Sequence, residues 1–307
     1  MVKWSRVNHS TIRPLDHFCV PGDLMVGATK RAFSFISDVW HEFTEDRGLL
    51  FAAAISFYGL ISLIPLLLVA IAVLGYITGS SETARQEVIT LARNLIPVGT
   101  EDLGQNLKAL SEQSGLLGGL GLLGLLWIGS QVFVTLQQVM NIALGSQRHI
   151  SFLRGRLVAL AMVVVTGILI AISIGVTSVL TALSHFHPPW GYAFDSDAIL
   201  GLLGTVVTIF TSTLAFVLAY KFLPTKSIGT MGPVWGGVTA GLLFEAAKYA
   251  FSWYVTNVVN YSRIYGSIGG AVILVLWIYY VSVIAVLGAE IASVHARRVG
   301  AVNGQDG

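Results

Sequence analysis

Six long runs of apolar residues constrain what this chain can fold into more than any other feature. They lie at residues 49–79, 116–144, 157–183, 199–220, 232–257 and 267–294. Each is longer than the roughly 20 residues that a helix needs to cross a hydrocarbon core about 30 Å thick. A helix is favoured there because it bonds all its backbone polar groups within one segment. The runs predict an all-α, polytopic membrane protein built as a bundle of six transmembrane helices.

The composition excludes a soluble or a disordered chain. Of the 307 residues, 54% are hydrophobic and 11% are Asp, Glu, Lys or Arg. An average soluble domain has about 25% charged residues to cover its surface. The apolar runs and the aromatic content exclude disorder. The single cysteine, Cys19, excludes an internal disulfide bond and a multi-cysteine metal site.

The distribution of basic residues predicts the orientation of the bundle. With the N-terminus inside, thirteen basic residues lie in inner segments, four lie in outer loops, and Lys248 lies within the fifth span. The inner ones are Lys3, Arg6, Arg13, Lys30, Arg31, Arg47, Arg148, Arg154, Arg156, Lys221, Lys226, Arg297 and Arg298, and the outer ones are Arg85, Arg93, Lys108 and Arg263. The positive-inside rule then places both termini in the cytoplasm.

The domain organisation follows from the spans. We expect a cytoplasmic N-terminal segment over residues 1–48, a transmembrane domain over 49–294 and a cytoplasmic tail over 295–307. The first span is expected to act as an uncleaved anchor. The outer loop at 80–115 predicts two short amphipathic helices separated at Pro97. A helical outer cap on the bundle is favoured over a lid that gates a ligand.

An amphipathic pattern marks the N-terminal segment. Within residues 24–46, four large apolar side chains recur on one helical face, and most of the charged ones lie elsewhere; the apolar ones are Phe33, Ile36, Trp40 and Phe43. This pattern is typical of a helix that lies in the membrane interface, in contact with membrane lipids.

Glu245 and Lys248 form the sharpest polar feature in the spans. They lie near the middle of the fifth span and, three residues apart, share one helical face. A charge at the bilayer centre costs roughly 2.5–3.5 kcal/mol on insertion scales, so such residues are expected to face the bundle interior or a wet cavity. Two interpretations stay open. The pair is either a substrate or proton site in which Lys248 binds an anionic group, or a structural pair that neutralises itself.

Two further groups of residues are candidates for a polar lining. Pro65 interrupts the hydrogen bonding of the first span, and Ser62 and Tyr58 lie on about the same face. They indicate either a cavity lining or a simple kink. At the end of the second span, Gln137 and Asn141 share a face and suit interhelical hydrogen bonds or a polar lining, with the former favoured.

Glycine pairs at small-xxx-small spacing mark the fifth span, namely Gly232 with Gly236 and Gly237 with Gly241. Such pairs let helix backbones approach closely in lipid, so packing is favoured over a hinge. These faces fit contacts within one bundle or between two copies of the chain, which leaves a homo-oligomer open.

No catalytic motif supports an enzyme. The sequence has no GxxxxGK[ST], HExxH or GxSxG pattern. His185 and His187 lack a nearby third ligand, so we expect no metal site. No cofactor is indicated. The basic residues Arg148, Arg154 and Arg156 are explained by positive-inside topology and anionic lipid headgroups, so no nucleic-acid partner is expected.

Three segments carry more specific motifs. The first span reads AAAISFYGLISLIPL over residues 52–66, the fifth reads FEAAK over 244–248, and the sixth combines YGSIGG, LWIY and LGAE within 265–290. Over about residues 30–295 the chain resembles the YihY/virulence factor BrkB family of bacterial inner-membrane proteins, once labelled ribonuclease BN. The most specific part is the sixth-span motif, with Tyr265, Gly266, Trp277, Gly288 and Glu290. At the end of the second span the chain departs from the family pattern, because no aromatic residue stands between Asn141 and Gly145.

The resemblance implies a multi-pass protein of the bacterial inner membrane. For Glu290, near the inner end of the sixth span, a structural contact with the basic 148–156 loop or with backbone amides is favoured. The leading hypothesis is a transporter of a lipid-like or amphipathic anionic solute, held in a cavity between spans one, two, five and six. The alternative is a structural or envelope-assembly protein, and a membrane ribonuclease is the least favoured. The substrate, energy coupling and direction of movement stay open.

Overall fold

The computed structural model describes residues 21–78, 114–146, 152–184, 196–226, 228–257 and 269–303. Nearly all of these residues are helical, and there is no strand among them. The helices are α1 (Pro21–Glu45), α2 (Gly48–Thr78), α5 (Ser114–Ala143), α6 (Phe152–Ser184), α7 (Ser196–Phe222), α8 (Met231–Asn257) and α10 (Gly269–Asn303). The predicted cap helices lie outside the described residues.

The prediction of an all-α polytopic membrane protein is confirmed. In the described part of the chain, five helices are long and apolar enough to cross a membrane: Gly48–Ala70, Gly118–Ala143, Phe152–Ala182, Leu200–Phe222 and Gly269–Val299. The fifth predicted span, residues 232–257, is the helix α8, which has a suitable length but is not one of these five helices. Its glycine, tyrosine and tryptophan residues and its two charges make it less apolar. It packs instead between α7 and α10.

Helix ends follow local sequence signals. At the end of α5, Gly145 adopts a left-handed backbone with φ of 58°. The amides of Gly145 and Ser146 donate to the carbonyls of Ile142 and Asn141, at 2.8 and 2.9 Å. This is the pattern of a Schellman C-cap, which favours glycine. At the end of α7, Pro224 disfavours a helical conformation for the preceding residue, so the helix ends at Phe222.

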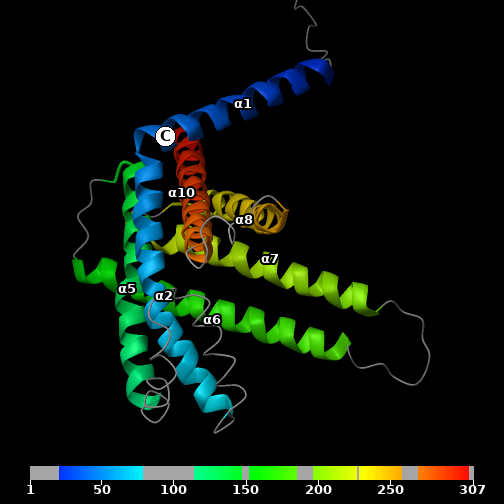
Figure 1. Ribbon diagram of the computed structural model, residues 1–307. Coiled ribbons are helices and arrows are strands. Elements are labelled where there is room, and N and C mark those ends of the chain that lie inside the picture. Colours follow the sequence, from blue (N-terminus) through cyan, green and yellow to red (C-terminus); the bar gives the residue numbers. More distant parts are fainter. Residues whose placement is uncertain are drawn as a thin grey trace, which may run out of the picture. The chain divides into compact units, whose positions relative to one another are not determined.

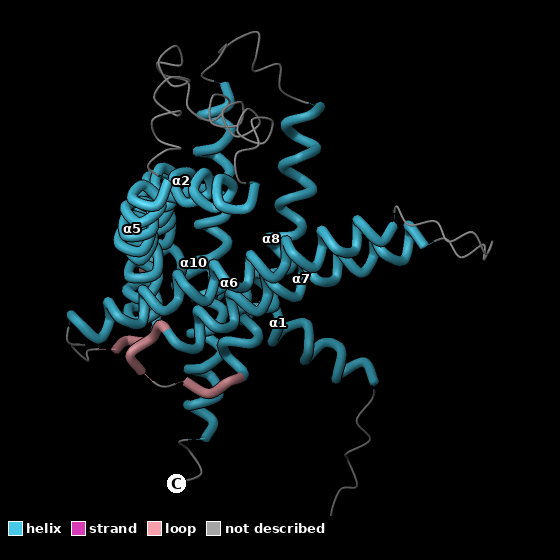
Figure 2. Tube along the Cα trace, turned by 90° about the horizontal axis from the view of Figure 1, so that it is seen from below, coloured by secondary structure: helices cyan, strands magenta, loops and turns pink. Residues whose placement is uncertain are grey.

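The helices after α1 pack as two crossing groups. Helices α2 and α5 run side by side in both views, and α6 and α7 form a second pair that crosses their direction (Figures 1 and 2). Helix α10 contacts α2, α5 and α8, while α8 contacts α7. These contacts all lie within the compact unit Val39–Gly307.

The buried core gathers where one end of each helix meets the others. The fully buried side chains include Met140 near the end of α5, Tyr220 near the end of α7 and Val286 in α10. The hydroxyl of Tyr220 donates to the carbonyl of Ala285 at 2.7 Å, which satisfies its polar atom inside this core. The start of α2 contributes Ala52 to the same cluster. Most of this end of the unit is therefore closely packed.

Helix α1 covers nearly the same residues as the predicted amphipathic segment, but one of the four predicted apolar side chains is not exposed. Phe33, Ile36 and Trp40 are exposed, as an interfacial helix requires. Phe43 is different, because it is buried in the core cluster. The cause is local, since Arg47 takes a left-handed backbone (φ of 56°) and turns the chain from α1 into α2. This turn brings Gly48 against the Phe43 ring.

Candidate functional site

Helix α8 places Glu245 and Lys248 together on one face. The Lys248 Nζ and the Glu245 Oε2 are 2.8 Å apart, and the two residues are one helical turn from each other. Glu245 is buried, with 6% of its surface exposed, whereas the Lys248 side chain is about one-third exposed. The Lys248 Nζ also lies 5.3 Å from the centroid of the Phe244 ring. The charge of Glu245 is therefore compensated within its own helix.

Glycine spacing explains why this face meets α7. Gly237, Gly241 and Glu245 recur every four residues and so share one side of α8. A Cβ added at Gly237 would lie 2.7 Å from the Val217 amide nitrogen, and one at Gly241 would lie 3.0 Å from the Thr213 Cα. These two glycines let α8 pack closely against α7. The next residue on the same side of α8 is Glu245, so its carboxylate also faces α7.

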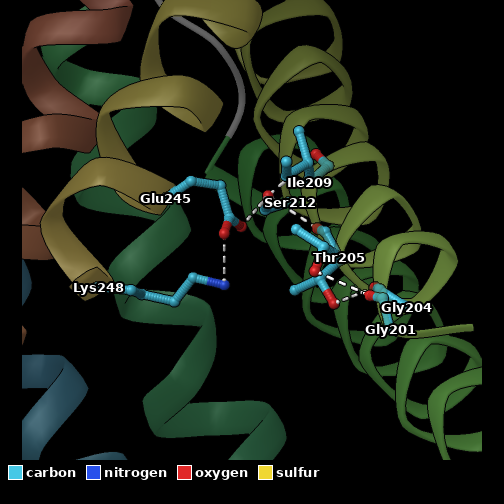
Figure 3. A network of polar contacts seen from close by, with 8 residues as sticks. Gly201, Gly204, Thr205, Ile209, Ser212, Glu245 and Lys248 are labelled. Carbon is cyan, nitrogen blue, oxygen red and sulfur yellow. Dashed lines mark hydrogen bonds and ion pairs between the residues drawn. The ribbon is translucent and has the colours of Figure 1, made fainter. Parts of the chain in front are cut away.

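A series of hydroxyl groups on α7 leads to this carboxylate (Figure 3). The hydroxyls of Thr205 and Thr208 donate to the carbonyls four residues earlier, at 3.0 and 2.9 Å. The Ser212 hydroxyl lies 3.3 Å from the Glu245 Oε1 and also within 3.1 Å of two α7 carbonyls. Because one hydroxyl has a single proton, these three acceptors compete for it.

A polar cavity of about 340 Å³ opens beside the ion pair. Helices α6, α7 and α8 line it, and the lining comprises Thr177, Leu180, Thr181, Leu200, Gly201, Gly204, Thr205, Thr208, Glu245, Lys248 and Tyr249. The predicted cavity lay between spans one, two, five and six. The structure instead brings spans three and four to the charged pair, because the glycines of α8 direct that face toward α7.

A second and larger cavity of about 580 Å³ is mainly apolar. Side chains from α2, α5, α6, α7, α8 and α10 line it, including Phe133, Phe216, Phe244 and Trp277. Thr208 lines both cavities. Ser212 lines the apolar cavity and reaches the Glu245 carboxylate, which lines the polar one. The two spaces therefore adjoin along one face of α7.

This arrangement is suited to a molecule with an anionic end and an apolar body. An ammonium group has three N–H donors, and in the described part of the chain Glu245 is the only ion-pair partner of the Lys248 Nζ. Two donors stay available to an anionic group in the polar cavity. The adjoining apolar cavity offers aromatic and aliphatic surface to hydrocarbon, as ligand pockets commonly do.

The polar residues of the first span do not join this site. Pro65 is buried against α5, where a Cβ added at Gly124 would lie 3.2 Å from the Pro65 Cβ. The helix continues through Pro65, and α2 bends along its length (Figure 1). The Ser62 hydroxyl donates to the Gly59 carbonyl at 2.7 Å, and the Tyr58 ring packs edge-on against Phe57. These three residues are not among those lining either cavity.

Gln137 and Asn141 hold the chain that leaves α7. The Gln137 amide donates to the carbonyl of Leu223, just beyond the end of α7. The Asn141 Oδ1 accepts hydrogen bonds from the amide and the hydroxyl of Thr225, at 2.9 and 2.8 Å. Both partners lie beyond the end of α7, so these bonds tie α5 to the segment between α7 and α8, and neither residue lines the two cavities.

The residues of the sixth-span motif have separate positions. Trp277 lines the apolar cavity and packs against Phe251, with ring centroids 4.9 Å apart. Gly288 permits a close approach of α10 to α8, since a Cβ there would lie 2.7 Å from the Ala240 Cβ. Glu290 is fully buried, and neither carboxylate oxygen has a hydrogen-bond partner among the described residues. Tyr265 and Gly266 lie outside the described residues.

Arg156 is a buried charge that the sequence interpretation assigned to an inner loop. The structure starts α6 at Phe152, so Arg156 lies in its second turn, with 7% of its surface exposed. Its guanidinium donates to the Gln131 Oε1 at 2.8 Å and to the Trp127 carbonyl at 2.9 Å, and it stacks 4.1 Å from the Trp127 ring centroid. The sequence signal for this partner was Gln131, a polar side chain within the second predicted span.

A further group of charged residues lies near the turn between α1 and α2. Burial, followed by the neighbouring Glu42 carboxylate, raises the pKa of Asp46 above its ordinary value, while Arg297 acts in the opposite direction. The Arg297 guanidinium is 2.9 Å from the Glu42 Oε1. Among the described residues, no group of three or more His, Cys, Asp or Glu side chains is placed to hold a metal ion.

The fold and these cavities define a multi-pass helical membrane protein. The chain belongs to the virulence factor BrkB family, whose model matches residues 39–306. This confirms the family resemblance. No solved structure matches the chain.

Its relatives are described as membrane proteins. A UPF0761 membrane protein of Alkalilimnicola ehrlichii is 28% identical over 84% of this chain and 57% of its own length. One from Legionella pneumophila is 26% identical over 87% of this chain and 63% of its own length. The chain therefore spans about three-fifths of these two relatives. A third, from Tolumonas auensis, is 26% identical, and the match covers 85% of this chain and 84% of the relative.

Proposed function

We propose that this protein translocates a lipid-like or amphipathic anionic solute across the bacterial inner membrane. The observation that carries the proposal is the pair of adjoining cavities. A polar space lined by Lys248 and Glu245 meets a larger apolar space along Thr208 and Ser212. An acidic headgroup would bind at Lys248, and acyl chains would occupy the space beside Trp277.

Binding at Lys248 has a clear electrostatic basis. Hydrogen bonds between an ammonium and an anionic oxygen are about twice as strong as neutral ones. Glu245 holds the ammonium in place and keeps the empty site neutral, which reduces the cost of a charge at membrane depth. An arriving anion would compete with Glu245 for Lys248, and the Ser212 hydroxyl could then turn its proton toward the released carboxylate.

The membrane orientation is part of this proposal. The Arg297–Glu42 ion pair joins the last helix to the end of α1, which supports both termini being on the same side. The excess of basic residues on that side supports the cytoplasm as its location. Because an even number of crossings is required, α8 would also cross the membrane and bring the number of spans to six.

A structural or envelope-assembly role is the second candidate. The observation in its favour is that several predicted site residues serve packing: Pro65 meets the glycines of α5, and Gln137 and Asn141 anchor the segment after α7. In that role the Glu245–Lys248 pair would tie α8 to α7 through Ser212 and would bind no solute.

Reconstitution with a defined lipid probe distinguishes the two roles. The full chain is placed in liposomes that contain fluorescently labelled phosphatidylglycerol, and movement between leaflets is followed by quenching from outside. Wild type is expected to accelerate this movement. Lys248→Ala should slow it at least about tenfold, which corresponds to about 1.4 kcal/mol and is close to the lower end of the range for one charge-assisted hydrogen bond. Lys226→Ala, an exposed lysine outside the cavities, is the control and should keep the wild-type rate.

Thermal stability in detergent separates loss of binding from loss of folding. Lys248→Ala leaves Glu245 buried without its cation and should cost about 1–3 kcal/mol. The double change Glu245→Ala with Lys248→Ala removes both charges and should be milder, yet still inactive. A double mutant with the wild-type rate, or a wild type that moves no phosphatidylglycerol, would contradict transport of this class of solute.

A further inference from the structure

Glu290 is a buried acidic residue without a hydrogen-bond partner or an ion pair in the described part of the chain. It is fully buried in α10, and neither of its carboxylate oxygens has a hydrogen-bond partner in the described part of the chain. An ionised carboxylate in such a place would lose its hydration without a replacement, which costs several kilocalories per mole. The neutral carboxylic acid avoids most of this cost.

Charged side chains of both signs act on Glu290. From the end of α1 and the following turn, Glu42 and Asp46 interact with it electrostatically, and from its own helix Arg297 does so. Two of these neighbours are acids and one is a base. The base is already engaged, because the Arg297 guanidinium is 2.9 Å from the Glu42 Oε1.

A second buried acceptor lies in the same cluster. The Asp46 Oδ2 is buried and has no hydrogen-bond partner among the described residues. Like an ionised Glu290, it is an acceptor without a donor. A protonated carboxyl group has one O–H donor, so a single proton bound in this cluster would supply the hydrogen-bond donor that these carboxylate oxygens lack.

We propose that Glu290 is a proton-binding site, which holds its proton at neutral pH and releases it on the side of the membrane where α1 meets α10. The proton leaves a carboxyl oxygen of Glu290 for water, and the residue becomes an anion. Arg297 then has two anionic neighbours, so proton release is linked to the Arg297–Glu42 contact that joins the two helices. Glu290 would bind and release this proton whether or not the protein moves a lipid.

Infrared spectroscopy of the full chain in nanodiscs tests the proposal directly. The carbonyl stretch of a protonated carboxyl group is distinct from that of a carboxylate. Wild type is expected to show this band at neutral pH and to lose it in alkali. Glu290→Gln should lack the band. The matched control is Glu245→Gln, the same change at another buried glutamate, which has a lysine partner at 2.8 Å and should leave the band intact.

Two variants keep the test decisive if Glu290→Gln does not fold. Asp46→Asn removes a neighbouring negative charge and should move the midpoint of band loss to lower pH by about one unit. Arg297→Gln removes the positive charge and should move it to higher pH. A wild type without the band at neutral pH, a band that persists in Glu290→Gln, or shifts with the same sign in both variants would overturn the proposal.

Discussion

At the scale of single residues, the charges inside this protein are accommodated by different chemistry. Arg156 is buried but donates to a glutamine side chain and a carbonyl, and it stacks on Trp127. Glu245 is buried beside its own lysine. Glu290 has neither arrangement. Because a buried charge is tolerated when it is paired and hydrogen-bonded, these contacts distinguish residues that look alike in the sequence.

Asp46 provides a pH test at this scale. Its pKa is raised in the folded protein, so the folded state holds the proton more tightly than the unfolded state does. Stability contributed by this group is present in acid and is lost as the pH rises through the folded pKa. Asp46→Asn removes this loss. The variant should therefore be more stable than wild type at pH 7, by less than about 1 kcal/mol because the group is partly exposed.

Thermal unfolding in detergent from acidic to neutral pH measures this difference. The advantage of Asp46→Asn should shrink as the pH falls, because both proteins then carry a neutral side chain at this position. An advantage that grows in acid would contradict the assigned direction of the pKa shift.

At the scale of helices, α8 owes its position to glycines on two faces. Gly232 and Gly236 face α10, where an added Cβ would lie 2.7 Å from the Ala292 carbonyl oxygen and the Ala292 Cβ, respectively. Gly237 and Gly241 face α7. The sequence identified both pairs as packing surfaces, but spacing within one helix carries no information on which neighbour each pair meets. That assignment directs Glu245 toward α7 and creates the polar cavity.

Alanine substitution measures the contribution of this close approach. Gly237→Ala would push a Cβ against the backbone of Val217, and overpacking of this kind costs about 1–3 kcal/mol. The matched control is Gly167→Ala in α6, where an added Cβ meets nothing within 4 Å. The control should be neutral or slightly stabilising, since alanine is the better helix former. Chemical denaturation in mixed micelles compares the two, and equal effects would refute the packing role of Gly237.

At the scale of the whole molecule, the closely packed core lies where the start of α2 and the ends of α5, α7 and α10 meet. Helices that alternate in direction bring these ends to one side. The same ends are rich in basic residues, so this side is expected to be cytoplasmic. The polar cavity is lined by residues nearer the opposite ends of α6 and α7, such as Thr181 and Leu200.

Cysteine labelling checks the orientation. In a Cys19→Ser background, Asp195→Cys should react with a membrane-impermeant maleimide added to intact cells that lack an outer-membrane barrier. Gln305→Cys should react only after the membrane is opened, because the C-terminus is expected in the cytoplasm. The reverse pattern would refute the predicted orientation, and labelling of both positions from outside would require an odd number of crossings.

The linear pattern of apolar residues determined the class of this protein. Runs such as 157–183 permit few folds in hydrocarbon, because their backbone groups must bond within the segment. Short motifs determined the family, and the i, i+3 spacing placed Glu245 beside Lys248. These properties depend on residues close together in the chain, so they could be predicted without a structure.

Contacts between distant segments decided the remaining features. Ser212 approaches Glu245 across 33 positions of sequence, and Thr225 bonds Asn141 across 84. The burial of Phe43, the partners of Arg156 and the isolation of Glu290 likewise depend on which helices adjoin. In a membrane many helix faces are similarly apolar, so hydropathy does not select among neighbours. Glycine-mediated close approach and interhelical hydrogen bonds make that selection, and they act only once the helices are packed together.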